Sequence, residues 1–511
     1  MLTRCVRKPG RRSIIILSIF LWFLVSCRRH QEIPRVSRIP PSPTASIISV
    51  PASDPKQSAP LLVLTPVTFP TTTYLQTSVD GLPHYTIDIL LNARDRFMQV
   101  EQYVVFVNHT NDVWEKVVFS VPPAHMNGVF LLQDVEIITR ERTRLADTDM
   151  QNTMLHVLLP ESLKPGELLG IRLTFVVRIP SIAPSTWLPE GNLGAGDLVI
   201  QAGDWHPTLV PYVEGTGWHT WEYYAVGDPT VYPAASFDVH ISADPDLIIA
   251  GPGEVVQPGP VRFYQLQQAR SFAFTASYDY QVIEASVDGI PVRSFYVHPY
   301  AEGGQAVMDT VQMALPFLST LFGPYPVPDL VIAQNAYYGS MEYSGFISMS
   351  DYAYKTYQKA PADLLVNLSV HELAHQWWYS AVGNDQVYEP WLDESFAKYS
   401  ELLFYERYYP DVVPWWWENH IDRYNPGGPV NTPIYSYQNT ADYIHQVYSQ
   451  GARFLDDLRA DMGDAQFFAF VKAYQEYGQG RIVSSEDFFT VLSAYSAGDL
   501  VRIVDQYFEF E

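Results

Sequence analysis

The segment His371-Glu372-Leu373-Ala374-His375, followed nineteen residues later by Glu394, decides how the C-terminal half of this chain is expected to fold. Residues four apart lie one above the other on a helical face, so His371 and His375 can bind the same metal ion. Glu372 is offset by one position and can reach a water molecule on that metal. We expect this segment to lie in a helix over 361–382, with Pro361 in its first turn and Gly383 just past its end.

A third metal ligand is expected from a neighbouring helix, predicted over residues 391–408. The loop 383–390 is long enough for this helix to return antiparallel, so that Glu394 faces the two histidines. Two imidazoles and one carboxylate form a zinc site with a fourth position left for water. Zinc lowers the pKa of that water, and a carboxylate that removes its proton completes a hydrolytic nucleophile. The sequence therefore predicts one zinc ion per chain, bound by His371, His375 and Glu394, with Glu372 as the general base.

Three further motifs lie around this pattern. Gly339-Ser340-Met341-Glu342-Tyr343 precedes it, Trp391-Leu392-Asp393-Glu394-Ser395-Phe396-Ala397 contains the third ligand, and Tyr448-Ser449-Gln450-Gly451-Ala452 follows it. Together they resemble the M1 aminopeptidases, a family of gluzincins with the HExxH-x18-E signature. The resemblance is specific over residues 320–460 and looser in the N-terminal half, where Trp218 and the stretch from Gly227-Asp228 to Tyr232-Pro233 are similar to the family's first domain.

The resemblance implies a fold, an activity and roles for further residues. The fold is multidomain α+β, in which an N-terminal antiparallel, saddle-like β-sheet domain precedes a thermolysin-like, mainly helical zinc domain. The activity is removal of N-terminal residues from peptides. Glu342 would bind the substrate's α-amine beside a peptide-binding strand, and Tyr448 would stabilise the oxyanion, with Tyr443 as the fallback. Further substrate contacts are expected from Gly339, Ser340, Met341 and, from the first domain, Gln201 with its neighbour Asp204.

Several positions depart from the family pattern. Tyr343 stands in place of the usual Asn, Asp393 in place of another Asn, and Gln450 in place of Lys, while Ser340 replaces an Ala. If Tyr343 disables amine binding, the protein would be a zinc endopeptidase. A non-catalytic binding protein is a third alternative, although such relatives are expected to lose a ligand or the base. The family's large C-terminal helical domain is expected to be absent, which would leave the site more open.

The chain divides into four expected segments: a signal peptide over 1–26, a Pro-rich tether over 27–71, a β domain over 72–285 and the catalytic domain over 286–511. Short segments rich in Val, Ile, Phe and Tyr, separated by turn residues, predict antiparallel strands in the β domain. These strands are expected at 85–91, 99–108, 114–121, 155–159, 169–179 and 236–241. In the catalytic domain we expect strands at 292–297 and 330–333 and further helices at 306–322, 448–462, 465–477 and 487–495.

The first thirty residues predict the compartment. A basic start and an apolar run of about a dozen residues are typical of a signal peptide. Ser26 directly before Cys27 resembles the lipobox of bacterial lipoproteins, in which Cys27 would carry the lipid. An uncleaved signal anchor is the alternative. Both predict an extracytoplasmic protein attached to the membrane of a bacterial cell envelope, held away from the lipid by the tether.

Composition excludes several classes of protein. Aromatic residues make up 14% and charged residues 17%, which excludes a wholly disordered chain or a coiled coil. The net charge of −24 argues against a nucleic-acid partner. The oligomeric state does not follow from the sequence.

Two features near the third ligand leave alternatives open. Glu401, seven residues after Glu394, is either a hydrogen-bond partner of a ligand histidine or a plain surface carboxylate. The aromatic run Trp415-Trp416-Trp417 is either a substrate platform or, as we favour, packing, because consecutive helical residues point in all directions.

Overall fold

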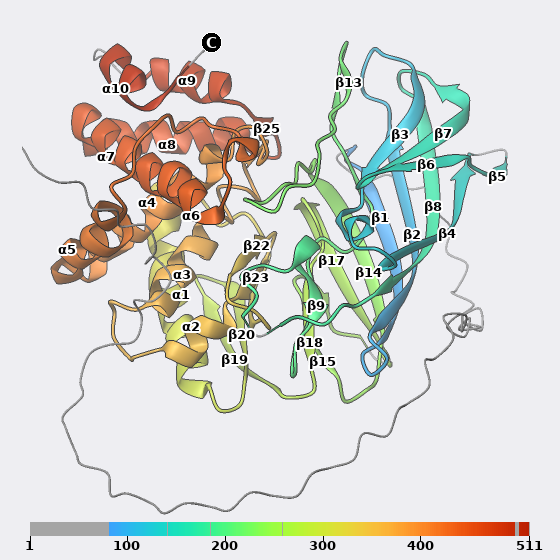
Figure 1. Cartoon of the computed structure of the whole chain (residues 1–511), viewed down its shortest axis with the longest axis horizontal. Helices are drawn as coiled ribbons and strands as arrows, with labels where there is room; N and C mark the ends of the chain where they lie inside the picture. Colours follow the sequence, from blue (N-terminus) through green and yellow to red (C-terminus); the bar gives the residue numbers. More distant parts are fainter. Residues whose placement is uncertain (1–80, 140–141, 184, 258, 496–499, 510–511) are drawn as a thin grey trace, which may run out of the picture. The chain divides into compact units, whose positions relative to one another are not determined.

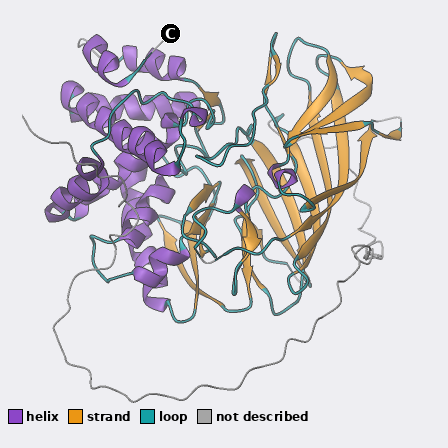
Figure 2. Ribbon diagram, in the orientation of Figure 1, coloured by secondary structure: helices purple, strands orange, loops and turns teal. Residues whose placement is uncertain are grey.

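The structure, a computed structural model, describes residues 81–509 except 140–141, 184, 258 and 496–499. The predicted signal peptide, Cys27 and the whole of the predicted tether lie outside these residues. Strands fill the N-terminal part of the described chain, and helices gather in its C-terminal part (Figures 1 and 2). None of the helices in the described part combines the length and the apolar character that crossing a membrane requires.

An eight-stranded sheet forms the body of the N-terminal region. Its strands alternate between buried and more exposed side chains, as expected where only one face of a sheet is fully covered. The pairing is antiparallel except between β1 and β14, which run parallel. In spatial order the strands are β16 (Glu254–Val255), β17 (Val261–Ala269), β14 (Ala235–Ser242), β1 (His84–Asn92), β2 (Phe97–Val107), β8 (Leu168–Arg178), β4 (Phe130–Ile138) and β5 (Thr143–Leu145).

Two smaller sheets and a short hairpin complete this region. They share a continuous apolar core with the large sheet, built around fully buried residues such as Phe237 and Trp205. The first sheet contains β11 (Thr208–Leu209), β3 (Trp114–Ser120), β7 (Met154–Leu163) and β6 (Thr148–Gln151). The second contains β15 (Ile248–Ala250), β18 (Phe274–Ser277), β10 (Ile200–Ala202) and β9 (Leu193–Ala195), and the hairpin is β12 (Tyr212–Val213) with β13 (Gly217–Trp218).

A five-stranded sheet begins the C-terminal region. Its order is β19 (Tyr280–Val287), β20 (Ile290–Val297), β21 (Leu330–Gln334), β23 (Phe346–Met349) and β22 (Met341–Tyr343), so β22 is an edge strand. The expected domain boundary at 285/286 falls inside β19, which pairs with β20 along its whole length. The hairpin therefore moves the start of this region to Tyr280.

The helices of the C-terminal region pack against this sheet and against one another. The longest, α1 (Ala301–Phe322), contacts both β20 and α3 (Leu364–Ala374), and α3 contacts α4 (Trp391–Tyr408). The remaining helices are α2 (Asp351–Thr356), α5 (Val413–Trp416), α6 (Thr440–Tyr443), α7 (Gly451–Met462), α8 (Asp464–Gly478), α9 (Ser485–Ser493) and α10 (Leu500–Tyr507). A short parallel pair, β24 (Gly383–Asn384) with β25 (Ile482–Val483), joins the turn after α3 to the segment before α9.

Two predicted helices differ from the structure. The helix expected over 361–382 is only α3, because the side chain of Asp363 caps its N-terminus by accepting from the Leu365 amide and the chain turns after His375. The helix expected from residue 448 begins earlier, since α6 continues through a π-helical segment over Ile444–Gln450 into α7. The aromatic and β-branched residues in this stretch gave no start signal at Asn439, whose side chain caps α6.

A buried arginine joins the two regions behind the site. Arg270, between β17 and β18, is 2% exposed and donates to four backbone carbonyls. These belong to Tyr232, Tyr379, Ala381 and Arg481. Burial lowers the pKa of Arg270 to about 10, which leaves it charged. Because three of these carbonyls come from the C-terminal region, Arg270 fixes the turn after α3 against the β-rich region.

Candidate metal centre and substrate cleft

Three predicted ligands meet at one point between α3 and α4. Nε2 of His371 lies 3.3 Å from Nε2 of His375, and Oε2 of Glu394 lies 3.3 and 3.4 Å from these two nitrogens. Zinc bonds of about 2.0–2.2 Å in tetrahedral coordination place neighbouring ligand atoms about 3.3 Å apart. The triangle therefore has the size that a tetrahedral zinc ion needs.

The other nitrogen of each histidine is engaged, which fixes the ring orientation. Nδ1 of His371 is 2.9 Å from Oε1 of Glu401, and Nδ1 of His375 is 2.9 Å from the carbonyl of Trp378. A carboxylate and a carbonyl can only accept, so each Nδ1 donates a proton. This tautomer leaves both Nε2 lone pairs directed at Glu394 and available to a metal.

The carboxylates of the site are buried and incompletely satisfied. Oε2 of Glu394 and Oε2 of Glu372 have no hydrogen-bond partner among the described residues. Burial raises the pKa of Glu394, but the two histidines, when they are protonated, outweigh burial and hold that pKa at about 2. For Glu372 burial dominates and raises the pKa to about 8. An unpartnered anionic oxygen beside two imidazole lone pairs fits a divalent cation.

Glu342 lies on β22, the edge strand of the five-stranded sheet, and its carboxylate faces the same centre. Its side chain is 3% exposed, and burial raises its pKa. Nε2 of Gln386 donates to Oε1 of Glu342 at 3.2 Å and to Oδ2 of Asp393 at 2.9 Å, while Oε1 of Gln386 accepts from Thr230. Thr230 belongs to the β-rich region, so both regions contribute to the position of Glu342.

Tyr448 lies over the metal-binding face. Its hydroxyl donates to Oε1 of Glu394 at 2.5 Å, and its ring stacks on His371 with the centroids 5.7 Å apart. Burial and the charge of Glu394 raise the pKa of Tyr448, which keeps the hydroxyl protonated. Gly451 makes this approach possible, because a Cβ there would lie 1.8 Å from Oγ of Ser395 on α4.

Glu401 and Trp416 both lie in the interior of the helical region. Glu401 accepts from His371, from Lys398 at 2.8 Å and from the indole of Trp416 at 2.7 Å, so it is not a surface carboxylate. Trp416 is fully buried, which excludes it as a substrate platform. Tyr443, the fallback for Tyr448, is also buried, but the hydrogen bond to Glu394 comes from Tyr448.

Most of the predicted substrate residues line a cleft of about 460 Å³ above the metal-binding face. They include Gly339, Ser340, Met341 and Glu342. Gln201 does not line it: its side chain is fully buried and accepts from Oγ of Ser348 behind the sheet. Asp204, two residues past the end of β10, does line the cleft.

Tyr343 also lies outside the cleft. Its side chain is fully buried, and its hydroxyl packs where a Cβ on Gly203 would lie, 2.2 Å away. Its backbone carbonyl accepts from Nε2 of Gln376, which follows directly after His375. The departure from the family's Asn therefore changes the support behind β22 and leaves Glu342 facing the cleft.

Sequence reasoning missed several residues at the site. Oxygen atoms of Asp228, Glu342 and Glu394 lie within 4.8 Å of one another. Gln386 bridges two carboxylates, and Lys398 neutralises Glu401. The stretch Gly227-Asp228-Pro229 gave a turn signal, whereas Gln386 and Lys398 gave none.

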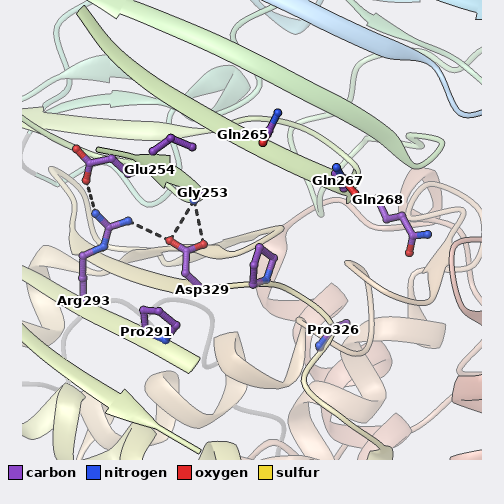
Figure 3. A pocket seen from close by; sticks show the side chains of 11 residues that line it. Gly253, Glu254, Gln265, Gln267, Gln268, Pro291, Arg293, Pro326 and Asp329 are labelled. Carbon is purple, nitrogen blue, oxygen red and sulfur yellow. Dashed lines mark hydrogen bonds and ion pairs between the residues drawn. The ribbon is translucent and has the colours of Figure 1, made fainter. Parts of the chain in front are cut away.

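A second groove, lined by residues of β16, β17, β20 and the segment before β21, has different chemistry (Figure 3). Gly253, Gln265 and Pro326 line it together with an ion-pair cluster. Arg293 in this cluster is paired with Glu254 and, at 3.0 Å, with Asp329. Arg293 thus pairs with both carboxylates of this groove.

Comparison with known proteins assigns the C-terminal region. The model of the peptidase family M1 domain matches residues 306–507, which include all three predicted ligands, Glu342 and Tyr448. This part of the chain is similar to peptidase family M1 domains. The resemblance stated from the motifs is thereby confirmed over these residues, and similarity to M1 zinc metallopeptidases implies zinc.

Curated relatives of the M1 domain are aminopeptidases. Endoplasmic reticulum aminopeptidase 1 of Homo sapiens is 25% identical over 248 residues, which are 46% of this chain and 26% of the relative. The mitochondrial aminopeptidase 2 of Saccharomyces cerevisiae is 25% identical over 250 residues, 44% of this chain and 25% of the relative. The chain thus spans about a quarter of the length of these relatives.

Solved structures support the fold over most of the chain. A variant of an M1 zinc metallopeptidase from Deinococcus radiodurans superposes with a TM-score of 0.59 and 17% identity, covering 84% of this chain and 94% of that one. The same protein bound to a Tyr-Ser-Ala substrate gives a TM-score of 0.58 over 84% and 95%. The predicted fold class, a β-sheet region followed by a mainly helical zinc-peptidase domain, is confirmed.

Proposed function

We propose that this protein is a zinc-dependent aminopeptidase that removes N-terminal residues from peptides. The observation that carries the proposal is the joint position of the His371–His375–Glu394 triangle and the Glu342 carboxylate in one cleft. The triangle has the dimensions of a hydrolytic zinc site, and Glu342 supplies a negative charge where a peptide's first residue would lie. The curated relatives named above are aminopeptidases, which supports the same activity.

When bound, zinc supplies a Lewis acid that activates water and polarises the scissile carbonyl. The protein's own residues then handle the protons. Glu372 accepts a proton from the attacking water and returns it to the leaving amine nitrogen. The hydroxyl of Tyr448, kept protonated by burial, donates a hydrogen bond to the oxyanion of the tetrahedral intermediate. His371, His375 and Glu394 hold the metal and do not transfer protons.

Glu342 determines where the cut falls. Its carboxylate accepts hydrogen bonds from the substrate's α-ammonium, a charge-assisted contact that only the first residue of a peptide can make. The peptide backbone can extend along the free edge of β22 as an added strand. Gln386 holds the carboxylate in place through its amide. Cleavage after the first residue follows from the separation between Glu342 and the metal-binding triangle.

The test compares hydrolysis of aminoacyl 4-nitroanilides by the wild type and by Glu372→Gln, each reconstituted with zinc. Wild-type turnover that is lost in Glu372→Gln and in the presence of a chelator supports the proposal; equal turnover in both proteins overturns it. Glu476→Gln, at an exposed position on α8, is the matched control. An N-acetylated peptide separates the alternatives, since an endopeptidase cleaves it and an aminopeptidase does not.

Attachment to the membrane forms part of the proposal. The sequence of residues 1–27 supports an extracytoplasmic lipoprotein anchored through Cys27. Incorporation of labelled palmitate into the wild type and its loss in Cys27→Ser would support the anchor. Membrane association that persists without label in Cys27→Ser would favour the uncleaved signal anchor.

A further inference from the structure

One corner of the cleft contains a buried hydrogen-bond acceptor that has no partner among the described residues. We call it the acceptor corner, formed by Asn192 and Asp204, which both line the cleft and are each 7% exposed. Nδ2 of Asn192 donates to Oδ2 of Asp204 at 3.3 Å. Oδ1 of Asn192 has no hydrogen-bond partner among the residues that the structure describes. A buried acceptor of this kind is costly unless a ligand supplies a donor.

The charge of the corner is also uncompensated. Within the described part of the chain, no Lys, Arg or His forms an ion pair with Asp204. The charged group that acts on it is Glu342, a second carboxylate, which adds to the burial that raises the pKa of Asp204 to about 7. A buried carboxylate next to another carboxylate favours a cationic ligand, since the protein brings no positive charge to it.

An organic cation fits the corner better than a metal ion. Among the described residues, the groups whose oxygen and nitrogen atoms converge closely enough for a metal do not include Asp204. Calcium and magnesium require about six or more oxygen ligands, and the corner provides a carboxylate and one amide oxygen. An ammonium or guanidinium group carries several N–H donors that can satisfy both acceptors at once.

Two aromatic side chains contribute to the cleft that contains the corner. Trp221 and Tyr223 line the same cleft, and the charge of Asp204 contributes to raising the pKa of Tyr223, after burial and Glu190. Aromatic surfaces accommodate the aliphatic stem of a long basic side chain and attract its charged end. The corner thus combines an apolar wall with an anionic end, the pattern that recognises Lys and Arg.

We propose that the acceptor corner binds the positively charged side chain of the substrate's N-terminal residue, so that the enzyme prefers peptides beginning with Lys or Arg. This inference rests on the proposed aminopeptidase function, in which Glu342 takes the α-ammonium. Asp204 and Asn192 then take the second positive charge of the same residue.

The experiment compares substrates of equal shape and different charge. We expect kcat/KM of the wild type to be at least about tenfold higher for arginine than for citrulline 4-nitroanilide, and for lysine than for norleucine 4-nitroanilide. In Asp204→Asn both ratios should fall toward one. Asp244→Asn removes the same charge from the far β-sheet, where Asp244 pairs with Arg94, and should keep the wild-type ratios.

Two results would overturn the inference. The first is a pair of wild-type ratios near one. The second is an equal loss of kcat/KM for charged and uncharged substrates in Asp204→Asn, which would mean that Asp204 binds the α-ammonium. Failure of the proposed function is distinct, because then no substrate is hydrolysed in a Glu372-dependent way. In that case calorimetric titration with arginine amide and citrulline amide decides. Tighter binding of arginine amide that is lost in Asp204→Asn supports the corner, and equal binding overturns it.

Discussion

The Nδ1 atom of His371 lies 2.9 Å from Oε1 of Glu401, a carboxylate that also accepts from Lys398 and from the indole of Trp416. Glu401 is 1% exposed; burial raises its pKa, but Lys398 and His371 outweigh this and lower it. A permanently charged acceptor at this position fixes the tautomer of His371 and strengthens its Nε2 as a ligand.

Glu401→Gln should therefore weaken zinc binding by about 10- to 100-fold. Competition with a fluorescent chelator measures the dissociation constant directly, without reference to activity. Glu406→Gln on the same helix, where Glu406 pairs with Arg459, is the control and should bind zinc as the wild type does. Unchanged affinity in Glu401→Gln would show that His371 is oriented by its packing alone.

Glu372→Gln should retain zinc and lose about 10²- to 10⁴-fold in kcat, since the amide cannot accept the proton of the attacking water. Metal content by atomic absorption and kcat on an aminoacyl 4-nitroanilide are the two measurements. A variant that loses zinc as well would assign Glu372 to the metal site instead of to proton transfer.

Tyr448→Phe should lower kcat by about 10²- to 10³-fold with little change in KM, because the hydroxyl acts on the oxyanion and not on the bound substrate. Steady-state kinetics on one substrate checks this split. Tyr443→Phe is the matched comparison, since Tyr443 lies near Tyr448 in the same cleft but the hydrogen bond to Glu394 comes from Tyr448. A larger loss in Tyr443→Phe would reverse the two roles.

Stability should fall with rising pH because of Asp204. Its pKa is about 7 in the folded protein, raised chiefly by burial, and about 4 in an unfolded chain. The folded state thus holds the proton more tightly, so the contribution is complete below about pH 4 and is lost as the pH rises through 7. The free energy of unfolding of Asp204→Asn, compared with that of the wild type, should therefore rise by about 2–3 kcal/mol when the pH is changed from 5 to 8. Urea unfolding at both values tests this; a pH-independent difference would contradict it.

Arg270→Met should destabilise the protein by about 3–5 kcal/mol, because it leaves up to four buried carbonyls without a donor. The stability of Arg270→Lys should lie between those of the wild type and Arg270→Met, since an ammonium keeps the charge but not the planar set of donors. Thermal and urea unfolding measure the effect. Arg94→Met, at a largely exposed ion pair, is the control and should change stability little.

The sequence by itself determined the metal centre. His371 and His375 are four residues apart in a helix, and helical geometry makes them neighbours whatever surrounds them. The number of residues between His375 and Glu394 allowed the next helix to return antiparallel to the first. The motifs around Glu342 and Tyr448 occur in the same order as in the family. Most predicted strands were found with small shifts of their ends, since alternation along the chain is a local property.

Tertiary structure decided the residues around that centre. Gln201 was placed in the cleft from sequence, but β10 turns it toward Ser348 and leaves Asp204 facing the substrate. Gln386 contacts Glu342, 44 positions away, and Thr230, 156 positions away. Such contacts depend on how the β-rich region packs against the C-terminal region, and no periodicity along the chain encodes them. Local spacing therefore determined the chemistry, whereas long-range packing decided which charges and hydrogen bonds surround it.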